Sequence, residues 1–198
     1  MATSQPDGFR LLLDQGFPKP TTFVVAALDR SVSVEHFSDF APELAARSTP
    51  DWYVYCVAAE AGFDALVVRD RSQLDQLAEM YVLSRLRELS IVTWRKSIED
   101  PVREWGQLLA HLPQIKQRCR EAGGRAVLLP TPVLTSQSYH DPRRTLGADA
   151  RRRGVSTQQV HHEADLEIRG WLVLTGEDPD RFEDLLHERG GGRSNEWT

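Results

Sequence analysis

Three aspartates lie beside apolar segments, and their carboxylates are the side chains of this chain best suited to chemistry. Asp14 ends the apolar run at 11–13, Asp70 follows the apolar run at 65–68, and Asp51 lies between them in the sequence. A short apolar run that ends in an acid is typical of a buried parallel strand that delivers a carboxylate to the sheet edge. In open α/β sheets, ligands bind at the carboxyl ends of the strands, so chemistry is expected at Asp14.

The chemistry that such a group of acids predicts is that of a hard divalent cation. Packing Asp14, Asp51 and Asp70 together is costly unless a cation neutralises them. Oxygen ligands at a sheet edge suit Mg²⁺ or Mn²⁺, which retain water and bind substrate phosphates. Such a metal activates water and stabilises the charge of a phosphodiester under attack. The alternative for each aspartate is a structural acid that caps the next helix.

Alternating strands and helices are expected to position these acids between residues 10 and 130. Apolar runs predict strands, and amphipathic segments that begin after Pro or Ser/Thr predict helices. The expected strands lie at 10–13, 31–37, 65–68, 90–94 and 125–129, and the expected helices at 21–28, 51–60, 74–89 and from 100 to about 122. Residues 38–47 are expected to form a loop. This alternation predicts an α/β fold with a mostly parallel central sheet flanked by helices.

The pattern changes after Pro132, which divides the chain into an expected domain at 1–132 and a C-terminal extension at 133–198. The extension is expected to be α+β, with a basic helix that ends at 151–154, a second short helix that opens at 156–159, a strand at 168–175 and a short helix at 178–189. It has few apolar residues, so we expect it to dock on the main domain or on a second subunit. The final GGGRSNEWT is expected to be disordered.

Composition limits the possible classes of protein. The 198 residues carry a net charge of −5, which argues against non-specific binding of nucleic acid by bulk charge. No apolar run approaches the roughly 20 residues of a membrane span, and no secretory signal is visible at the N-terminus. We therefore expect a cytoplasmic protein with no membrane partner, in which Cys56 and Cys119 are reduced and buried.

The segments around the three aspartates also resemble the motifs of a known family. RLLLDQGFP, STPDWYVY and ALVVRDRSQ look like the three motifs of PIN-like nuclease domains, most closely those of prokaryotic toxin–antitoxin-type proteins. The resemblance covers roughly residues 10–130. It implies a PIN-like fold and a Mg²⁺- or Mn²⁺-dependent ribonuclease with metal ligands at Asp14, Asp51 and Asp70. It also implies an RNA substrate, a cognate antitoxin protein and a possible homodimer.

Several charged neighbours are candidates for further roles in this site. Asp75 lies one helical turn beyond Asp70 and is a candidate fourth ligand, although a solvated helix acid is the alternative. Arg69, Arg71 and Lys19 are candidates for holding substrate phosphate, because paired guanidinium donors match phosphate geometry. The same cations could instead pair with neighbouring acids.

Two other functions are compatible with parts of the sequence. Gln15 and Val68 depart from the family pattern, and no clear fourth acid is visible, so a catalytically degenerate PIN-like binding or regulatory module is one alternative. LGADARRRGVSTQQV also allows a DNA-binding helix-turn-helix. Its second helix lacks the basic residues expected at phosphates, which disfavours that function.

Overall fold

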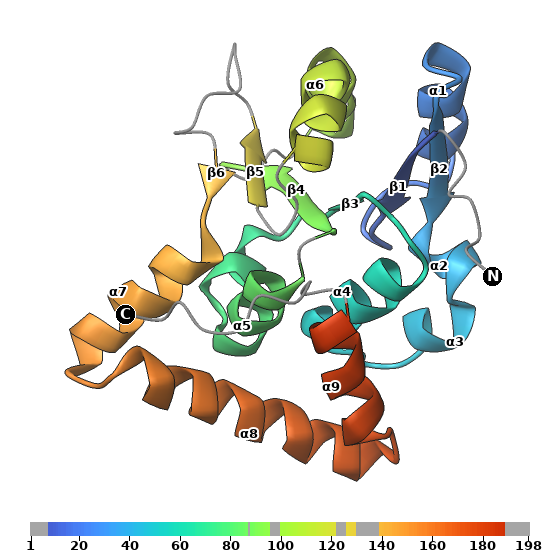
Figure 1. Cartoon of the computed structure of the whole chain (residues 1–198). Helices are drawn as coiled ribbons and strands as arrows, with labels where there is room; N and C mark the ends of the chain where they lie inside the picture. Colours follow the sequence, from blue (N-terminus) through green and yellow to red (C-terminus); the bar gives the residue numbers. More distant parts are fainter. Residues whose placement is uncertain (1–7, 87, 96–99, 122–125, 130–138, 189–198) are drawn as a thin grey trace.

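The protein is an α/β structure built on one six-stranded sheet, shown in Figure 1. The computed structural model describes residues 8–86, 88–95, 100–121, 126–129 and 139–188. The sheet has the order β2-β1-β3-β4-β5-β6, with β1 to β5 parallel and β6 antiparallel. The strands are β1 (Phe9–Leu13), β2 (Val32–His36), β3 (Ala65–Val67), β4 (Ser90–Trp94), β5 (Ala126–Leu129) and β6 (Tyr139–His140). The expected mostly parallel sheet is confirmed.

The register brings the carboxyl ends of the first three strands to one edge of the sheet. Leu13, the last residue of β1, pairs with His36 of β2 on one side and with Val67 of β3 on the other. Because these strands are parallel and in step, the residues that follow them emerge side by side. This edge carries both Asp14 and Asp70.

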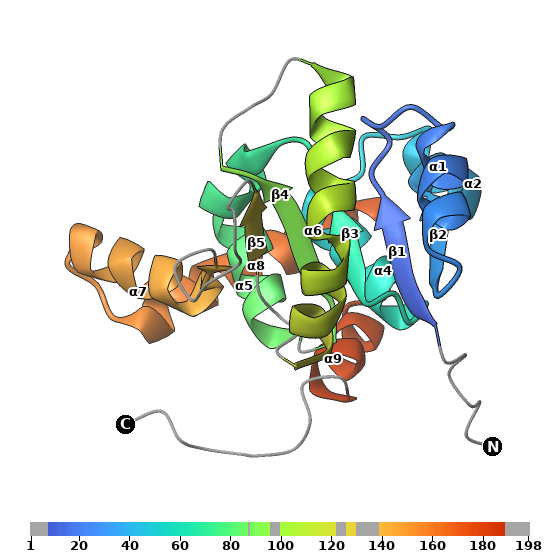
Figure 2. The same ribbon diagram turned by 90° about the horizontal axis from the view of Figure 1, so that it is seen from above.

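Helices cover both faces of the sheet, which explains why the central strands are apolar throughout. On one face, α1 (Thr21–Leu28) and α6 (Pro101–Glu121) pack on Leu11 and Leu13 through residues such as Val25 and Leu108. Figure 2 shows α6 crossing above the strands. On the other face, α4 (Asp51–Glu60) and α5 (Leu77–Arg85) pack on Leu12.

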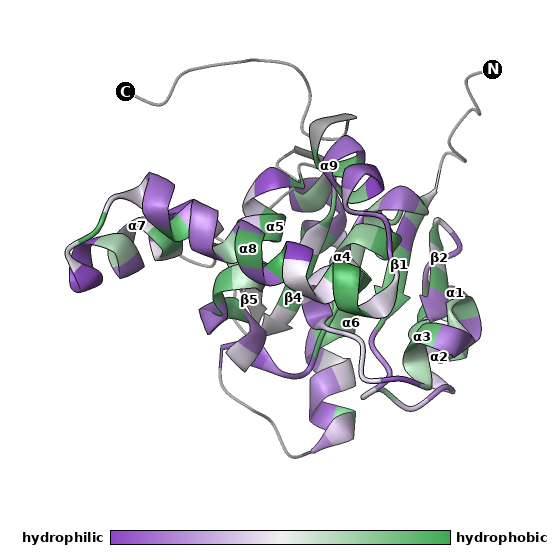
Figure 3. Ribbon diagram, turned by 90° about the horizontal axis from the view of Figure 1, so that it is seen from below, coloured by the Kyte–Doolittle hydropathy of each residue, from purple (hydrophilic) through white to green (hydrophobic). Residues whose placement is uncertain are grey.

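The C-terminal extension docks on the main domain, as one of the two expectations had it. Its helices are α7 (Pro142–Arg153), α8 (Thr157–Thr175) and α9 (Pro179–Glu188). They contact α4 and α5, and their buried residues continue the core on that face. In Figure 1, α8 runs beneath α5 and α4, and Figure 3 shows that α7 is largely hydrophilic. The boundary expected at 132 and the final tail lie outside the described residues.

The strand predicted at 168–175 is wrong, because this segment is the second half of α8. The buried residues of α8 recur every fourth position, at Val160, Ala164, Ile168 and Leu172. That period matches a helix, and it outweighs the strand preference of the local sequence. Apart from the short β6, which joins the main sheet, the described part of the extension is helical rather than α+β.

Two smaller predictions also need correction. The expected loop at 38–47 contains the short helices α2 (Phe37–Phe40) and α3 (Pro42–Ala45). The helix predicted at 74–89 is instead a 3₁₀ turn, η1 (Arg71–Asp75), followed by α5. The break arises because Gln76 is extended rather than helical.

Two further expectations concern the cysteines and membrane spans. Cys56 in α4 and Cys119 in α6 are both free and buried, which confirms their expected state. None of the described helices is long and apolar enough to cross a membrane.

Candidate functional site

Asp14 is held in a tight turn at the end of β1. Its backbone N–H donates to the carbonyl of Val67 at 3.0 Å, and its own carbonyl accepts from the N–H of Phe17 at 3.0 Å. Phe17 is buried against Trp94 with ring centroids 5.8 Å apart. The carbonyl of Phe17 also accepts from Nε2 of the buried His36 at 2.8 Å. The turn is therefore in contact with residues of β2, β3 and β4, which hold the backbone of Asp14 in place.

Gly16 in this turn lies close to two functional side chains. A Cβ at this position would lie 3.3 Å from Cδ of Arg69 and 3.4 Å from a carboxylate oxygen of Asp14. A Cβ here would require the Arg69 side chain to shift by a few tenths of an ångström and would be in van der Waals contact with Asp14. The glycine therefore lets the strand-end aspartate and the arginine before Asp70 lie close together.

Asp51 and Asp70 reach the same edge from different elements. Asp51 is the first residue of α4, directly after the extended N-cap residue Pro50. Asp70 follows β3 and caps η1: one carboxylate oxygen accepts from the N–H of Ser72 at 2.8 Å and the other from its hydroxyl at 2.7 Å. Asp70 is exposed, whereas Asp14 and Asp51 are partly buried.

The three aspartates influence one another electrostatically. Burial and the charges of Asp14 and Asp70 raise the pKa of Asp51 to about 6. Burial also raises the pKa of Asp14, and the charge of Asp70 adds to that shift, while the N–H groups of Gln15 and Gly16 and the ring of His36 oppose it. Charges act on one another in this way only over limited distances, so the three acids lie in the same part of the molecule.

Their position in the sheet is one where ligands are bound in other α/β proteins. From β1 the chain passes to β2 on one side, and β3 lies on the other side of β1. The crevice at such a change of direction is the usual ligand site of a doubly wound sheet. Asp14 and Asp70 therefore flank the expected crevice.

A fourth acid, Glu79, belongs to the same group and was not predicted from the sequence. It lies in α5 and is buried. Burial and the charge of Asp51 raise its pKa to about 7, while the backbone of Trp52 donates to it and acts in the opposite direction. The available signal was its spacing: Glu79 lies three, four and seven residues before the buried Val82, Leu83 and Leu86. An acid on an apolar helical stripe indicates a specific role.

Tyr55 connects the acids to η1. It lies one turn after Asp51, is fully buried, and its hydroxyl donates to Oε1 of the buried Gln73 at 2.8 Å. Burial raises the pKa of Tyr55 well above its usual value, and the charges that add to this shift belong to Asp51, Glu79, Asp14 and Asp70. We call these four acids the acidic site. Tyr55 is the neutral hydrogen-bonding group among them.

The three candidate phosphate-binding cations differ in how close they lie to Asp14. Arg69 lies against the Asp14 turn, where its guanidinium donates to the carbonyl of Gly16 at 3.2 Å. Its Nε pairs at 3.0 Å with Glu104, which is buried in α6. Lys19 pairs instead with Asp39 of α2, and Arg71 donates to the carbonyl of Arg95 at 2.6 Å. Of the three, Arg69 has the contacts closest to Asp14.

Asp75 lies at the other end of η1 and faces β6 and α7. Its charge acts on His140 of β6, and it lines a cavity beside α7. It is not among the charges that shift the pKa values of Asp14, Asp51 or Tyr55. The structure therefore places Asp14, Asp51 and Asp70 within electrostatic reach of one another, places Glu79 within reach of Asp51, and places Asp75 elsewhere.

The oxygen donors of the acidic site suit a hard cation, but their present arrangement is open. Within the described ranges, no group of three or more His, Cys, Asp or Glu side chains is close enough to hold a metal ion as placed. Rotation of the exposed Asp70 carboxylate away from Ser72 is one change that would alter this arrangement.

The comparisons with known proteins give no independent assignment: no family model, curated protein or solved structure matches the chain.

Proposed function

We propose that this protein is a metal-dependent endoribonuclease with a PIN-like domain, acting as the toxin-like component of a toxin–antitoxin pair. The observation that supports this most strongly is the position of Asp14, Asp51 and Asp70 near the β1–β3 edge, where the charges of Asp14 and Asp70 raise the pKa of Asp51 and the charge of Asp70 raises that of Asp14. Retaining partly buried acids at this cost favours a site that a cation completes. The toxin-like role, a cognate antitoxin, a homodimer and a cytoplasmic location rest on the sequence resemblance and composition.

Mg²⁺ or Mn²⁺ would be held by Asp14, Asp51 and Asp70, with Glu79 beside them. When bound, such an ion supplies an activated water and stabilises the developing phosphate charge. Before it binds, Asp51 must lose its proton, and its pKa of about 6 allows this at neutral pH. Glu79, with a pKa of about 7, retains a proton in part of the molecules and can donate or accept one.

Arg69 is the residue we assign to the substrate phosphate. The contact with buried Glu104 fixes its orientation at Nε and leaves other N–H groups of the guanidinium for an anion. Since Arg69 lies against the turn of Asp14, a phosphate held there would be adjacent to the carboxylates. Arg71 and Lys19 are engaged elsewhere and would need to exchange their present partners to contribute.

The second candidate is a catalytically degenerate binding module, and one observation favours it. Both carboxylate oxygens of Asp70 are hydrogen-bonded by Ser72, and no described group of three donors encloses a metal position. A protein that binds RNA or a partner without cleaving it would not require these acids to rearrange.

A DNA-binding helix-turn-helix receives less support. The segments α7 and α8 are joined by a short turn at Gly154, as that motif requires. However, Arg152 and Arg153 pair with Asp149, and Arg153 also pairs with Glu163 of α8. Arg153 is therefore neutralised within the protein by two acids, and Arg152 is partly compensated by the Asp149 that it shares with Arg153.

Calorimetric titration with Mn²⁺ tests the proposed function. The wild type is expected to bind Mn²⁺, and Asp14→Asn/Asp70→Asn is expected to lose binding. Asp184→Asn, an exposed aspartate on α9, is the matched control and should bind as the wild type does. The wild type and Asp184→Asn should also cleave a single-stranded RNA, and Asp14→Asn/Asp70→Asn should not. If the wild type binds RNA but neither binds Mn²⁺ in its presence nor cleaves, the binding module is correct instead.

A further inference from the structure

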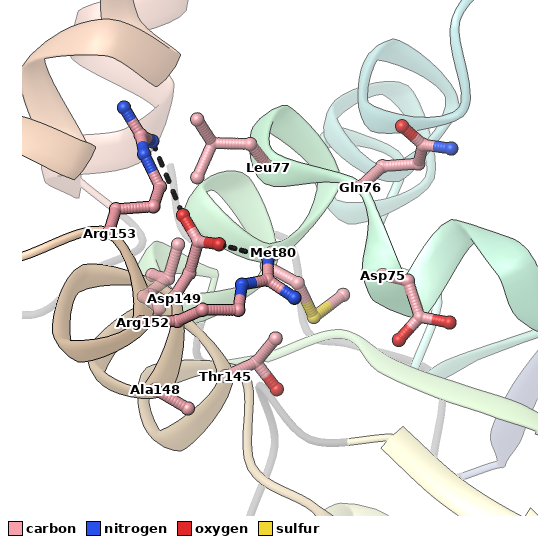
Figure 4. Close-up of a pocket in the computed structure, with 10 residues that line it drawn as sticks. Asp75, Gln76, Leu77, Met80, Thr145, Ala148, Asp149, Arg152 and Arg153 are labelled. Atoms are coloured by element: carbon pink, nitrogen blue, oxygen red, sulfur yellow. Dashed lines mark hydrogen bonds and ion pairs between the residues drawn. The ribbon is translucent and has the colours of Figure 1, made fainter.

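A cavity of about 470 Å³ lies between α7 and the segment that runs from η1 into α5 (Figure 4). Its size falls within the roughly 300–1,000 Å³ of small-molecule sites. The residues that line it include none of the four members of the acidic site. Any ligand bound here would therefore be recognised by different residues from those of the proposed nuclease function.

The floor of the cavity is apolar. Met80 of α5 and Leu146 of α7 are both about 1% exposed, and Leu77 is partly buried beside them. Methionine adapts its shape to irregular apolar partners, so this floor suits a branched or extended hydrocarbon group.

One wall of the cavity is acidic. Asp75 and Gln76 are exposed and lie where η1 ends. Within the described part of the chain, the Asp75 carboxylate takes part in no hydrogen bond or ion pair. Burial lowers the pKa of His140, and the charge of Asp75 opposes that shift. Asp75 therefore has carboxylate oxygens available to a cation that enters the cavity.

The opposite wall is basic and is held in place by ion pairs. Asp149 accepts hydrogen bonds from Arg152 and, at 3.3 Å, from Arg153. Arg153 is also bound to Glu163 of α8, so most of its charge is used within the protein. The side chain of Arg152 is 80% exposed, and its guanidinium has N–H groups beyond the one that contacts Asp149. In Figure 4, Asp75 and Arg152 lie on opposite sides of Met80.

We propose that this cavity binds a zwitterionic α-amino acid group with an apolar side chain, either as a free amino acid or as a short peptide. The two acids and two arginines that line the cavity cancel in net charge, but the available acid and the available guanidinium are on different walls. A simple anion or cation is attracted by one wall and repelled by the other. A zwitterion places its ammonium at Asp75, its carboxylate at Arg152 and its side chain on the Met80–Leu146 floor.

Calorimetric titration of the whole protein with L-leucine and with the dipeptide Leu-Leu tests this proposal. Saturable binding of either is expected, and the tighter one identifies the source of the ligand. N-acetyl-leucine, which lacks the ammonium, and leucinamide, which lacks the carboxylate, should each bind at least about tenfold more weakly. Glycine, which lacks the apolar side chain, should also bind more weakly. The proposal is wrong if neither zwitterion binds, or if N-acetyl-leucine or leucinamide binds as tightly as leucine.

Variants of the two walls make the test specific to the cavity. Asp75→Asn and Arg152→Gln should each weaken binding about tenfold. Arg151→Gln changes the preceding arginine of α7, which does not line the cavity, and should leave binding unchanged. All three positions are exposed, so circular dichroism should show an unchanged fold. Equal losses in Arg151→Gln and Arg152→Gln would overturn the proposal.

The result is independent of the proposed nuclease function. Asp14→Asn/Asp70→Asn should bind the zwitterion as the wild type does, because neither aspartate lines the cavity. A protein that binds leucine but not Mn²⁺ would support the cavity proposal and oppose the nuclease proposal, and the reverse result would separate them in the other direction.

Discussion

The pKa values of carboxylates are shifted in opposite directions in the acidic site and in the ion pairs of the C-terminal helices. In the acidic site, burial and neighbouring acids raise the pKa values of Asp14, Asp51 and Glu79. On α7, slight burial acts to raise the pKa of Asp149, but hydrogen bonds from Arg152 and Arg153 hold it below its usual value. Asp141 and Asp165 in the same extension also pair with arginines three or four residues away. The acidic site lacks this compensation, and such a difference is typical of functional sites.

The largest change in stability should come from removing the Trp52 side chain, which joins the helix of the acidic site to the C-terminal helices. This buried residue follows Asp51, and its ring packs edge-on against Trp171 of α8 at 5.2 Å and Phe182 of α9 at 5.5 Å. Trp52→Ala should lower the free energy of unfolding by about 3–5 kcal/mol, measured by urea denaturation. Phe23→Ala is the control, because Phe23 is 76% exposed and its loss should change little. Equal effects of the two variants would show that Trp52 does not anchor the extension.

A substitution in the acidic site is expected to change the free energy of unfolding by a smaller amount, and to raise it. The pKa of Glu79 rises from 4.5 to about 7 on folding, so its ionisation opposes the folded state. Wild-type stability should therefore fall as the pH rises from about 4.5 through 7. Glu79→Gln should reduce this slope, leaving the part that the raised pKa values of Asp51 and Asp14 contribute, and should stabilise the metal-free protein by about 1–2 kcal/mol at pH 8, after allowance for partial solvent screening.

The test is to measure the free energy of unfolding of Glu79→Gln and of the wild type by denaturation across this pH range. Asp184→Asn serves again as the control and should retain the wild-type slope. A wild-type stability that is flat between these pH values would contradict the assignment of Glu79 to the acidic site.

The smallest effect should come from the C-terminal network. Asp149→Asn weakens the contacts with Arg152 and Arg153 and should cause a slight loss of stability at low salt. The loss should disappear at high salt, because exposed ion pairs are screened. Urea midpoints at two salt concentrations provide the measurement. A loss that persists at high salt would show that Asp149 has a structural role beyond charge pairing.

The two strand-end acids could be predicted because a strand is indicated by the pattern of a few adjacent residues. LLL before Asp14 and ALV a few residues before Asp70 lie in buried parallel strands, and Pro50 precedes the helix that begins at Asp51. The strand prediction failed where two patterns overlapped. Residues 168–175 have strand-like composition but continue the four-residue spacing of the buried positions of α8.

Glu79 could not be placed from the sequence, although its position on an apolar stripe was visible. That stripe shows only that Glu79 faces the interior, not which other residues it meets. The packing of α5 on α4 brings it near Asp51, and the register of β1 with β3 brings Asp14 near Asp70. Asp75, by contrast, is close to Asp70 in sequence but is turned toward α7 by the η1 turn.

The sequence by itself determined the α/β class and the acids that emerge at strand and helix ends, because hydrophobic periodicity and helix-start signals act over a few residues. Only the tertiary structure decided which acids share one site and which charges are neutralised. These outcomes depend on strand order, register and helix packing, which are set by contacts between residues far apart in the chain.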